Sequence, residues 1–306
     1  MFVLNPDPYS LPCYRIGPFR TEDLSKNHQL PKSEFLDDYL DEKFVNREHF
    51  YTVNGREAIH LALKHYDLEK DDVVTILTTS GNFYISGCVT NEIEKFCKWS
   101  REIETRTKVL FVNHEFGYIY PEMEKLVSLD IPIIEDCCTT FFSQNRENKV
   151  GSYGDFAVYS FPKFFPIQVG GILVNNRQKP MAFPSQIEPA AKEYIRNVVS
   201  HHVKEEENLL RKRNNVFNYG IGLYSKLGFA ERFERESRIV PSVMLLKNYG
   251  ILSDLPELKK RLWAHGIQSS VFYGEDAFFI PSHQNLTEND IQYFFEVIKS
   301  TMEMHN

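Results

Sequence analysis

The chain has 306 residues, with a formal net charge of -7 at neutral pH. The length accommodates one large unit with a sizeable core and a smaller second unit. The acidic balance leaves no basic stripe for a nucleic-acid backbone or an anionic membrane surface. The sequence has no uncharged apolar run of about 18 residues and no cationic start followed by an apolar core. We therefore expect a cytoplasmic protein that binds neither nucleic acid nor membranes.

The first half of the chain alternates helical patterns with short apolar runs. Residues 55–66 place apolar side chains at helical spacing behind a glycine, and residues 121–127 form a second helical stretch. Strand-like apolar runs lie at 73–77, 109–112, 131–134, 156–160 and 171–174. Such runs are typical of strands buried on both faces. We predict a mainly parallel sheet flanked by helices, with ligands bound at the carboxyl ends of its strands.

The character of the sequence changes after Asn176, where a highly charged helical stretch begins. The remaining predicted elements are, in chain order, helix 190–212, helix 255–265, strand 268–273, strand 278–281 and a last helix capped by Thr287 that ends near Met302. We predict a large domain over 1–200, including an N-terminal arm, and a smaller α/β domain over 201–306. Without a flexible linker or a repeat between them, the two should pack as one body.

The five cysteines are Cys13, Cys88, Cys97, Cys137 and Cys138. Their number is odd, they lack paired metal-ligand spacing, and the vicinal pair cannot easily form an unstrained disulfide. We expect reduced thiols that act as small core residues, and no metal site. A redox role for the vicinal pair is the alternative.

Five stretches and one lysine form the most specific pattern in the chain. The stretches are Gly55-Arg-Glu-Ala-Ile-His-Leu-Ala-Leu63, Val112-Asn-His-Glu-Phe-Gly117, Ile134-Glu-Asp136, Val150-Gly-Ser-Tyr-Gly-Asp155 and Phe279-Ile-Pro-Ser-His-Gln-Asn-Leu-Thr287. With Lys163 before the Gly170-Gly171 pair, their order and spacing resemble the nucleotide-sugar aminotransferases of the DegT/StrS type. The resemblance implies pyridoxal 5'-phosphate as cofactor. It also implies a three-layer fold-type I large domain with a mainly parallel sheet, plus a smaller C-terminal α/β domain.

Lys163 and Asp136 are the predicted catalytic residues. Lys163 lies among Phe161, Phe164 and Phe165, and a lysine surrounded by aromatic residues is desolvated and more readily neutral. A neutral amine attacks an aldehyde, so the resemblance implies that Lys163 forms the Schiff base and carries the proton. Asp136 would keep the ring nitrogen protonated. The alternatives are a surface lysine on a loop and an aspartate that caps a helix.

The phosphate of the cofactor is expected at the helix that begins near Gly55. Unpaired N–H groups and the positive end of the helix dipole favour an anion there. Arg56 would add a charge-assisted contact or would be a solvated first-turn residue. Ser160 is similar to the family's phosphate-binding serine, although it lies closer to the lysine.

Three further residues are assigned to the cofactor ring. Phe83 is predicted to stack on it, although both Phe83 and Tyr84 would also suit the core. Thr139 replaces the family's glutamine and would donate to the phenolic oxygen. His114 resembles the family's loop histidine near the cofactor, and a hydrogen-bonded structural histidine is the alternative.

Three hypotheses follow. The first is an aminotransferase that moves an amino group from glutamate to the keto group of a nucleotide-linked sugar for surface polysaccharide synthesis, as a homodimer with its site at the two-fold interface. The second is a sugar dehydratase-like enzyme, against which Lys163 argues because a histidine replaces the lysine in that branch. The third is a cofactor-binding or scaffolding homologue without turnover. Arg56, Thr139 and the lack of a Gly-x-Asn-x-Arg segment motivate the third.

Overall fold

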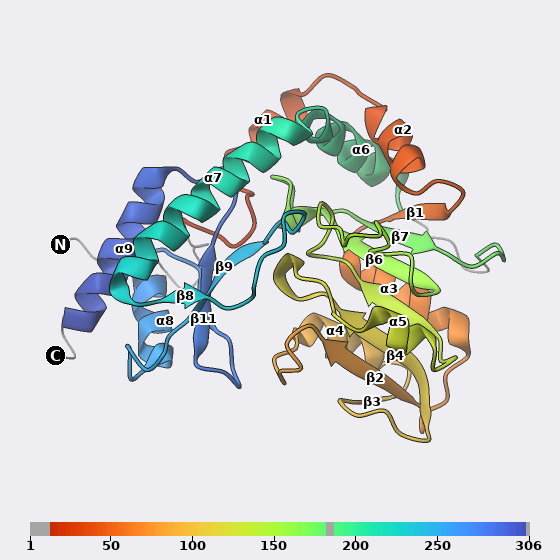
Figure 1. Cartoon of the computed structure of the whole chain (residues 1–306). Helices are drawn as coiled ribbons and strands as arrows, with labels where there is room; N and C mark the ends of the chain where they lie inside the picture. The colour runs from red at the N-terminus through yellow and green to blue at the C-terminus, as the bar shows by residue number, and fades with distance from the viewer. Residues whose placement is uncertain (1–12, 182–186, 304–306) are drawn as a thin grey trace.

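Two β-sheets, each with its own helical cover, organise residues 13–181 and 187–303, which the computed structural model describes (Figure 1). The first sheet has seven strands in the order β1-β7-β6-β5-β4-β2-β3. In chain order its strands are β1 (Glu48–Thr52), β2 (Val73–Thr78), β3 (Lys98–Ser100), β4 (Thr107–Asn113), β5 (Ile133–Asp136), β6 (Phe156–Ser160) and β7 (Gly171–Asn175). The pairs from β3 to β6 are parallel, whereas β7 is antiparallel to both β6 and β1.

The alternation of side chains along β4 explains why helices cover both faces of this sheet. Val109 and Phe111 pack into a core with α3 (Gly55–Leu63) and α4 (Gly87–Ile93). Leu110 and Val112 point the other way, against α5 (Met123–Val127). A strand buried on both faces must be apolar throughout, which is why the sequence pattern located it.

The antiparallel end of the sheet has a separate core. It contains Leu36 and Leu40 of α2 (Phe35–Lys43), Tyr159 of β6, and Ile195 and Val198 of α6 (Pro189–Val203). The helix α1 (Asp23–Gln29) precedes α2 near this end of the molecule. Single 3₁₀ turns lie at Lys64–Tyr66, Glu115–Gly117, Phe161–Lys163 and Ser225–Leu227.

The second sheet has four antiparallel strands in the order β10-β11-β9-β8. These strands are β8 (Ala230–Glu231), β9 (Val243–Lys247), β10 (Ser270–Val271) and β11 (Ala277–Pro281). Its core includes residues of α7 (Glu206–Tyr224), α8 (Leu255–Ala264) and α9 (Glu288–Glu303). Thr287 caps α9 as predicted, since its hydroxyl accepts from the N–H of Asp290 at 3.2 Å.

The long helix α7 links the two sheets (Figure 1). Leu209 near its start packs in the core beneath the first sheet, whereas Val216 and Phe217 pack in the core of the second. The predicted division near residue 200 stays a prediction. No helix within the described ranges is both long and apolar enough to cross a membrane.

The predicted fold class is confirmed, with three differences in the elements. The charged stretch 190–212 is not one helix, because α6 ends at Val203 and α7 begins at Glu206. Leu209 at the start of α7 shares a core with α6, whereas Val216 and Phe217 further along α7 pack in the core of the second sheet. A uniformly charged stretch gives no signal for the turn between the two helices. The strand predicted over 268–273 is only Ser270–Val271. The patterns missed the helices α1, α2 and α4 and the strands β1, β3, β8 and β9.

Candidate active site

A cavity of about 500 Å³ lies where the carboxyl ends of the parallel strands face the second sheet. This volume is typical of small-molecule sites. The cavity brings together six predicted site residues: Gly55, Arg56, Asp136, Thr139, Ser160 and Lys163. Its other wall comes from the C-terminal part of the chain, including Lys259, Trp263, Gln268, Ser269 and Phe279.

Asp136 ends β5 and is only 6% exposed. The N–H of Cys138 donates to its Oδ1 at 3.1 Å and holds the carboxyl group in place. Burial raises the pKa of Asp136, and the hydrogen bonds from Cys138 and the charge of Lys163 act in the opposite direction. A buried carboxyl group at this edge is therefore available to a ligand that offers a proton or a positive charge.

Lys163 lines the cavity, but the prediction of a desolvated lysine is wrong. Its side chain is exposed, whereas Phe161, Phe164 and Phe165 are fully buried in the core at the antiparallel end. Because Lys163 ends a tight 3₁₀ turn, it projects away from its aromatic neighbours in the sequence. The aromatic residues next to Lys163 in the sequence therefore do not surround its side chain in the structure.

The N-terminus of α3 forms one wall of the cavity. Asn54 caps the helix, its side chain accepting from the N–H of Glu57 at 3.1 Å. A Cβ at Gly55 would lie 2.9 Å from Cys138 Sγ and 3.4 Å from Ser160 Cβ, so only glycine allows this close approach. The first-turn N–H groups of Gly55 and Arg56 have no acceptor within the helix, which leaves them for an anion.

Comparison with known proteins supports what the motifs suggested. The model of the DegT/DnrJ/EryC1/StrS aminotransferase family matches residues 95–180, which include Asp136 and Lys163. This match confirms the resemblance to that family. The chain is also 28% identical to the GDP-perosamine synthase of Escherichia coli O157:H7 over 163 residues. The aligned stretch is 45% of this chain and 44% of that protein, so it spans less than half of its relative.

Solved structures share the fold over nearly the whole chain. The aminotransferase TlmJ from Streptoalloteichus hindustanus has a TM-score of 0.73 at 14% identity, with 100% of this chain and 99% of that one covered. PseC of Helicobacter pylori, an aminotransferase involved in the biosynthesis of pseudoaminic acid, has a TM-score of 0.69 at 14% identity, with 95% of this chain and 99% of that one covered. At these identities the likeness establishes the fold, which is that of fold-type I aminotransferases.

The prediction that Phe83 stacks on the cofactor ring is wrong, because its neighbour Tyr84 is the residue that lines the cavity. Phe83 is 79% exposed and does not line the cavity, whereas Tyr84 does. The Tyr84 ring lies 6.3 Å from that of Phe116 and 6.0 Å from that of Phe279, measured between centroids. Two adjacent aromatic residues in a loop give no periodicity from which the inward one could have been chosen.

The hydroxyl of Thr139 is not free to donate to a ligand. It donates to the carbonyl oxygen of His114 at 2.7 Å and accepts from the N–H of Gly117 at 3.0 Å. A hydroxyl group has one proton, and here that proton is already engaged. Thr139 therefore fixes the loop after β4, although its side chain also touches the cavity.

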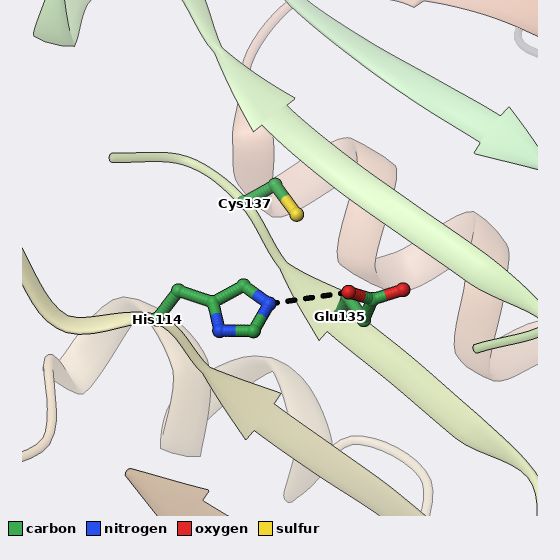
Figure 2. Close-up of side chains that lie close together, drawn as sticks. All are labelled: His114, Glu135 and Cys137. Atoms are coloured by element: carbon green, nitrogen blue, oxygen red, sulfur yellow. Dashed lines mark hydrogen bonds and ion pairs between the residues drawn. The ribbon is translucent and has the colours of Figure 1, made fainter. Parts of the chain in front are cut away.

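His114 is fully buried and faces Glu135 rather than the cavity (Figure 2). Its Nδ1 accepts from the N–H of Tyr120 at 3.1 Å, which places the proton on Nε2, 3.2 Å from Glu135 Oε2. The same carboxylate accepts from the N–H groups of Gly151, Tyr153 and Gly154. Two of the stretches that carry the resemblance therefore contact each other: Glu135 of Ile134-Glu-Asp136 holds the glycine loop of Val150–Asp155 in place.

Cys137 completes this buried group, since ligand atoms of His114, Glu135 and Cys137 lie within 4.8 Å of one another (Figure 2). Burial raises the pKa of the Cys137 thiol well above its usual value, and the negative charge of Glu135 acts in the same direction. A metal ion needs a thiolate and an unprotonated nitrogen. The contacts instead favour a hydrogen-bonded structural network.

Sequence reasoning missed Phe116, which lines the cavity, and Arg213, which bonds the backbone of the lining residue Ser242 without lining the cavity itself. Phe116 adopts a left-handed backbone conformation, with φ of 54°, which is unusual for a bulky residue and turns its ring into the cavity. Arg213 of α7 is buried, donates to the carbonyl oxygens of Pro241 and Ser242 at 3.1 Å each, and lies 4.6 Å from the ring centroid of Phe164. The only sequence signal for this region was that Phe116 lies in the loop pattern Val112–Gly117, two residues after His114.

Proposed function

We propose that this protein is a pyridoxal 5'-phosphate-dependent aminotransferase that acts on the keto group of a nucleotide-linked sugar, with glutamate as amino donor. The observation that carries the proposal is one cavity lined by a lysine, a buried carboxyl group and a helix N-terminus. These groups fit the cofactor's aldehyde, ring nitrogen and phosphate respectively. The match of residues 95–180 to the aminotransferase family supports the same assignment.

Each residue has a separate task in this proposal. Bound cofactor supplies an electron-accepting ring conjugated to the reacting carbon. Asp136 keeps the ring nitrogen protonated, and its burial makes that ion pair stronger than it would be in water. Lys163 Nζ attaches the cofactor and then carries the proton to and from the reacting carbon. Its exposed position gives the amine room to move between these tasks.

The polar rim of the cavity suits a phosphorylated substrate. Arg56 of α3 and Lys259 of α8 line it from opposite elements and bring positive charge to a chain whose net charge is -7. Ser160 lies beside Gly55 and is assigned to the cofactor phosphate. The nucleotide-linked acceptor is inferred from the GDP-perosamine synthase relative. A role in surface polysaccharide synthesis is inferred from the resemblance to the DegT/StrS type alone.

The assembly is part of the proposal. We infer a homodimer, because the family that this chain resembles places its site at a two-fold interface. We also infer a cytoplasmic location and a division into a large domain over 1–200 and a smaller one over 201–306. Sedimentation of the purified protein tests the dimer, and a stable monomer that retains full activity would contradict it.

The decisive experiment follows the covalent link. Purified protein is incubated with pyridoxal 5'-phosphate, its visible absorbance is recorded, and borohydride reduction followed by peptide mass analysis locates the attached group. We expect a yellow protein labelled at Lys163, no label in Lys163→Ala, and an unchanged label in Lys259→Ala, a control lysine of the same cavity. Absence of cofactor uptake by folded protein would refute the proposal.

Addition of glutamate separates the transferase from the alternative without turnover. We expect the visible band to fall as the amino group is transferred. A labelled Lys163 whose band responds to no amino acid would favour a cofactor-binding homologue.

A further inference from the structure

Two buried polar groups without partners line the cavity from different parts of the fold. Glu115 follows β4 of the first sheet, and Ser269 precedes β10 of the second; each is 4% exposed. Within the described part of the chain, Glu115 Oε1 and Ser269 Oγ have no hydrogen-bond partner. A buried polar atom without a partner carries a desolvation penalty that a ligand can remove. Neither residue has a task in the cofactor chemistry proposed above.

The position of Glu115 is fixed by its other contacts. Its Oε2 accepts from the N–H of Ser80 at 2.6 Å, and its own N–H donates to Thr79 Oγ1 at 3.0 Å. Both contacts come from the loop after β2, so the unused oxygen is held rather than free to turn toward solvent. Such preorganisation is what a specific recognition group needs.

Aromatic rings stand next to this carboxylate. Phe116, its neighbour in the chain, lies 5.0 Å from the ring of Phe279 and 6.3 Å from that of Tyr84. All three line the cavity. Together they offer flat apolar surface, on which the C–H face of a sugar ring packs while its hydroxyl groups point sideways.

The chemistry of the two unpartnered groups selects among the substrates. An ionised carboxylate only accepts hydrogen bonds, whereas a serine hydroxyl donates and accepts. Sugar hydroxyls match both, because each can donate to Glu115 and accept from Ser269. The amino donor glutamate carries two carboxylates of its own, which a buried Glu115 would repel.

We propose that Glu115 determines specificity for the acceptor: its Oε1 accepts a hydrogen bond from a hydroxyl group of the sugar, with Ser269 bonding a second one. The inference rests on the proposed function, and it assigns these residues to only one of the two half-reactions. Removing the acceptor oxygen leaves a substrate hydroxyl unpaired and should lower that half-reaction about 10- to 100-fold.

The test measures the half-reactions separately by the visible band of the cofactor-loaded enzyme. Glutamate drives the first, and a panel of nucleotide-linked amino sugars that includes GDP-perosamine drives the second in reverse. Glu115→Gln should retain the glutamate rate within about threefold and lose about 10- to 100-fold in kcat/KM with the amino sugar, mainly through KM. Ser269→Ala should show a smaller loss confined to the same half-reaction.

Glu92→Gln is the matched control, because Glu92 is also buried, at 5% exposure, and does not line the cavity. It should leave both half-reactions unchanged. Equal losses in both half-reactions of Glu115→Gln, or none, would overturn the assignment. If wild-type enzyme responds to glutamate and to no amino sugar, the sugar assignment fails although the cofactor assignment stands. If it binds no cofactor, the proposed function itself has failed.

Discussion

Replacing Glu135 with glutamine should strongly destabilise the fold, although the two side chains have nearly the same volume. Oε1 accepts from the N–H groups of Tyr153 and Gly154 at 2.7 and 2.9 Å. Oε2 accepts from the N–H of Gly151 at 2.9 Å and from His114 Nε2 at 3.2 Å. In glutamine one of these oxygens becomes an amide NH₂ group, so two donors would face a third.

His114 cannot relieve the conflict by changing tautomer, because its Nδ1 already accepts from the N–H of Tyr120. At least two hydrogen bonds to a charged group are lost, at about 1.5–3 kcal/mol each, so the free energy of unfolding should fall by about 3–6 kcal/mol. That is a large part of the roughly 5–15 kcal/mol by which folded proteins are stable.

Urea unfolding followed by circular dichroism measures the change directly. The control is Glu124→Gln, which removes an exposed carboxylate that accepts from the hydroxyl of Tyr153 at 2.7 Å. Its effect should stay below about 1 kcal/mol. A Glu135→Gln protein within about 1 kcal/mol of wild type would show that this carboxylate does not hold the glycine loop.

Further predictions concern the cavity and the response to pH. Gly55→Ala should lower both stability, by about 1–3 kcal/mol, and affinity for pyridoxal 5'-phosphate, because the new Cβ would lie 2.9 Å from Cys138 Sγ; unchanged affinity in a titration would contradict this. Thr139→Val should reduce stability by about 1–3 kcal/mol and leave cofactor affinity unchanged, since its hydroxyl bonds only the backbone. Phe83→Ala should change neither stability nor cofactor affinity, because its side chain is exposed; a lower cofactor affinity would show that the Phe83 ring does contact the cofactor. Burial lowers the pKa of His283 to about 3 from its ordinary value of 6.5. Because the pKa is lower in the folded state, the unfolded chain binds the proton first as the pH falls. The free energy of unfolding should therefore be highest above pH 6.5 and decrease as the pH drops toward 3, by about 2–3 kcal/mol at pH 4.5. His283→Gln should flatten that part of the profile, and an identical acid response would contradict the assignment.

The five inner strands of the first sheet, β2 and β4 to β7, could be predicted because burial on both faces leaves a clear apolar run, whereas the edge strands β1 and β3 are partly exposed and were missed. β6 was predicted with the bounds that the structure shows, Phe156–Ser160, and α3 began at Gly55 as expected. The missed strands β3 and β8 have three and two residues and carry no such run. Their pairing depends on partners far away in the chain, which no local pattern reveals.

The candidate site was predicted where the chain passes the carboxyl edge of the sheet. Asp136 and Lys163 line one cavity because the strand ends bring them to the same edge. The wall from the second sheet escaped prediction, since Ser269 reaches the cavity only through tertiary packing. The effect of the aromatic neighbours of Lys163 was wrongly predicted for a related reason. The sequence shows which residues lie next to Lys163, but the direction in which each side chain points depends on the 3₁₀ turn.

The continuity of α7 has a consequence for how substrates enter. One end of this helix is anchored beneath the first sheet and the other in the second. From its middle, Arg213 bonds the backbone beside the cavity wall and covers the ring next to Lys163. Because α7 is packed into both cores, we expect the two sheets to move as one body. A ligand would then enter the cavity through small displacements of side chains at its edge.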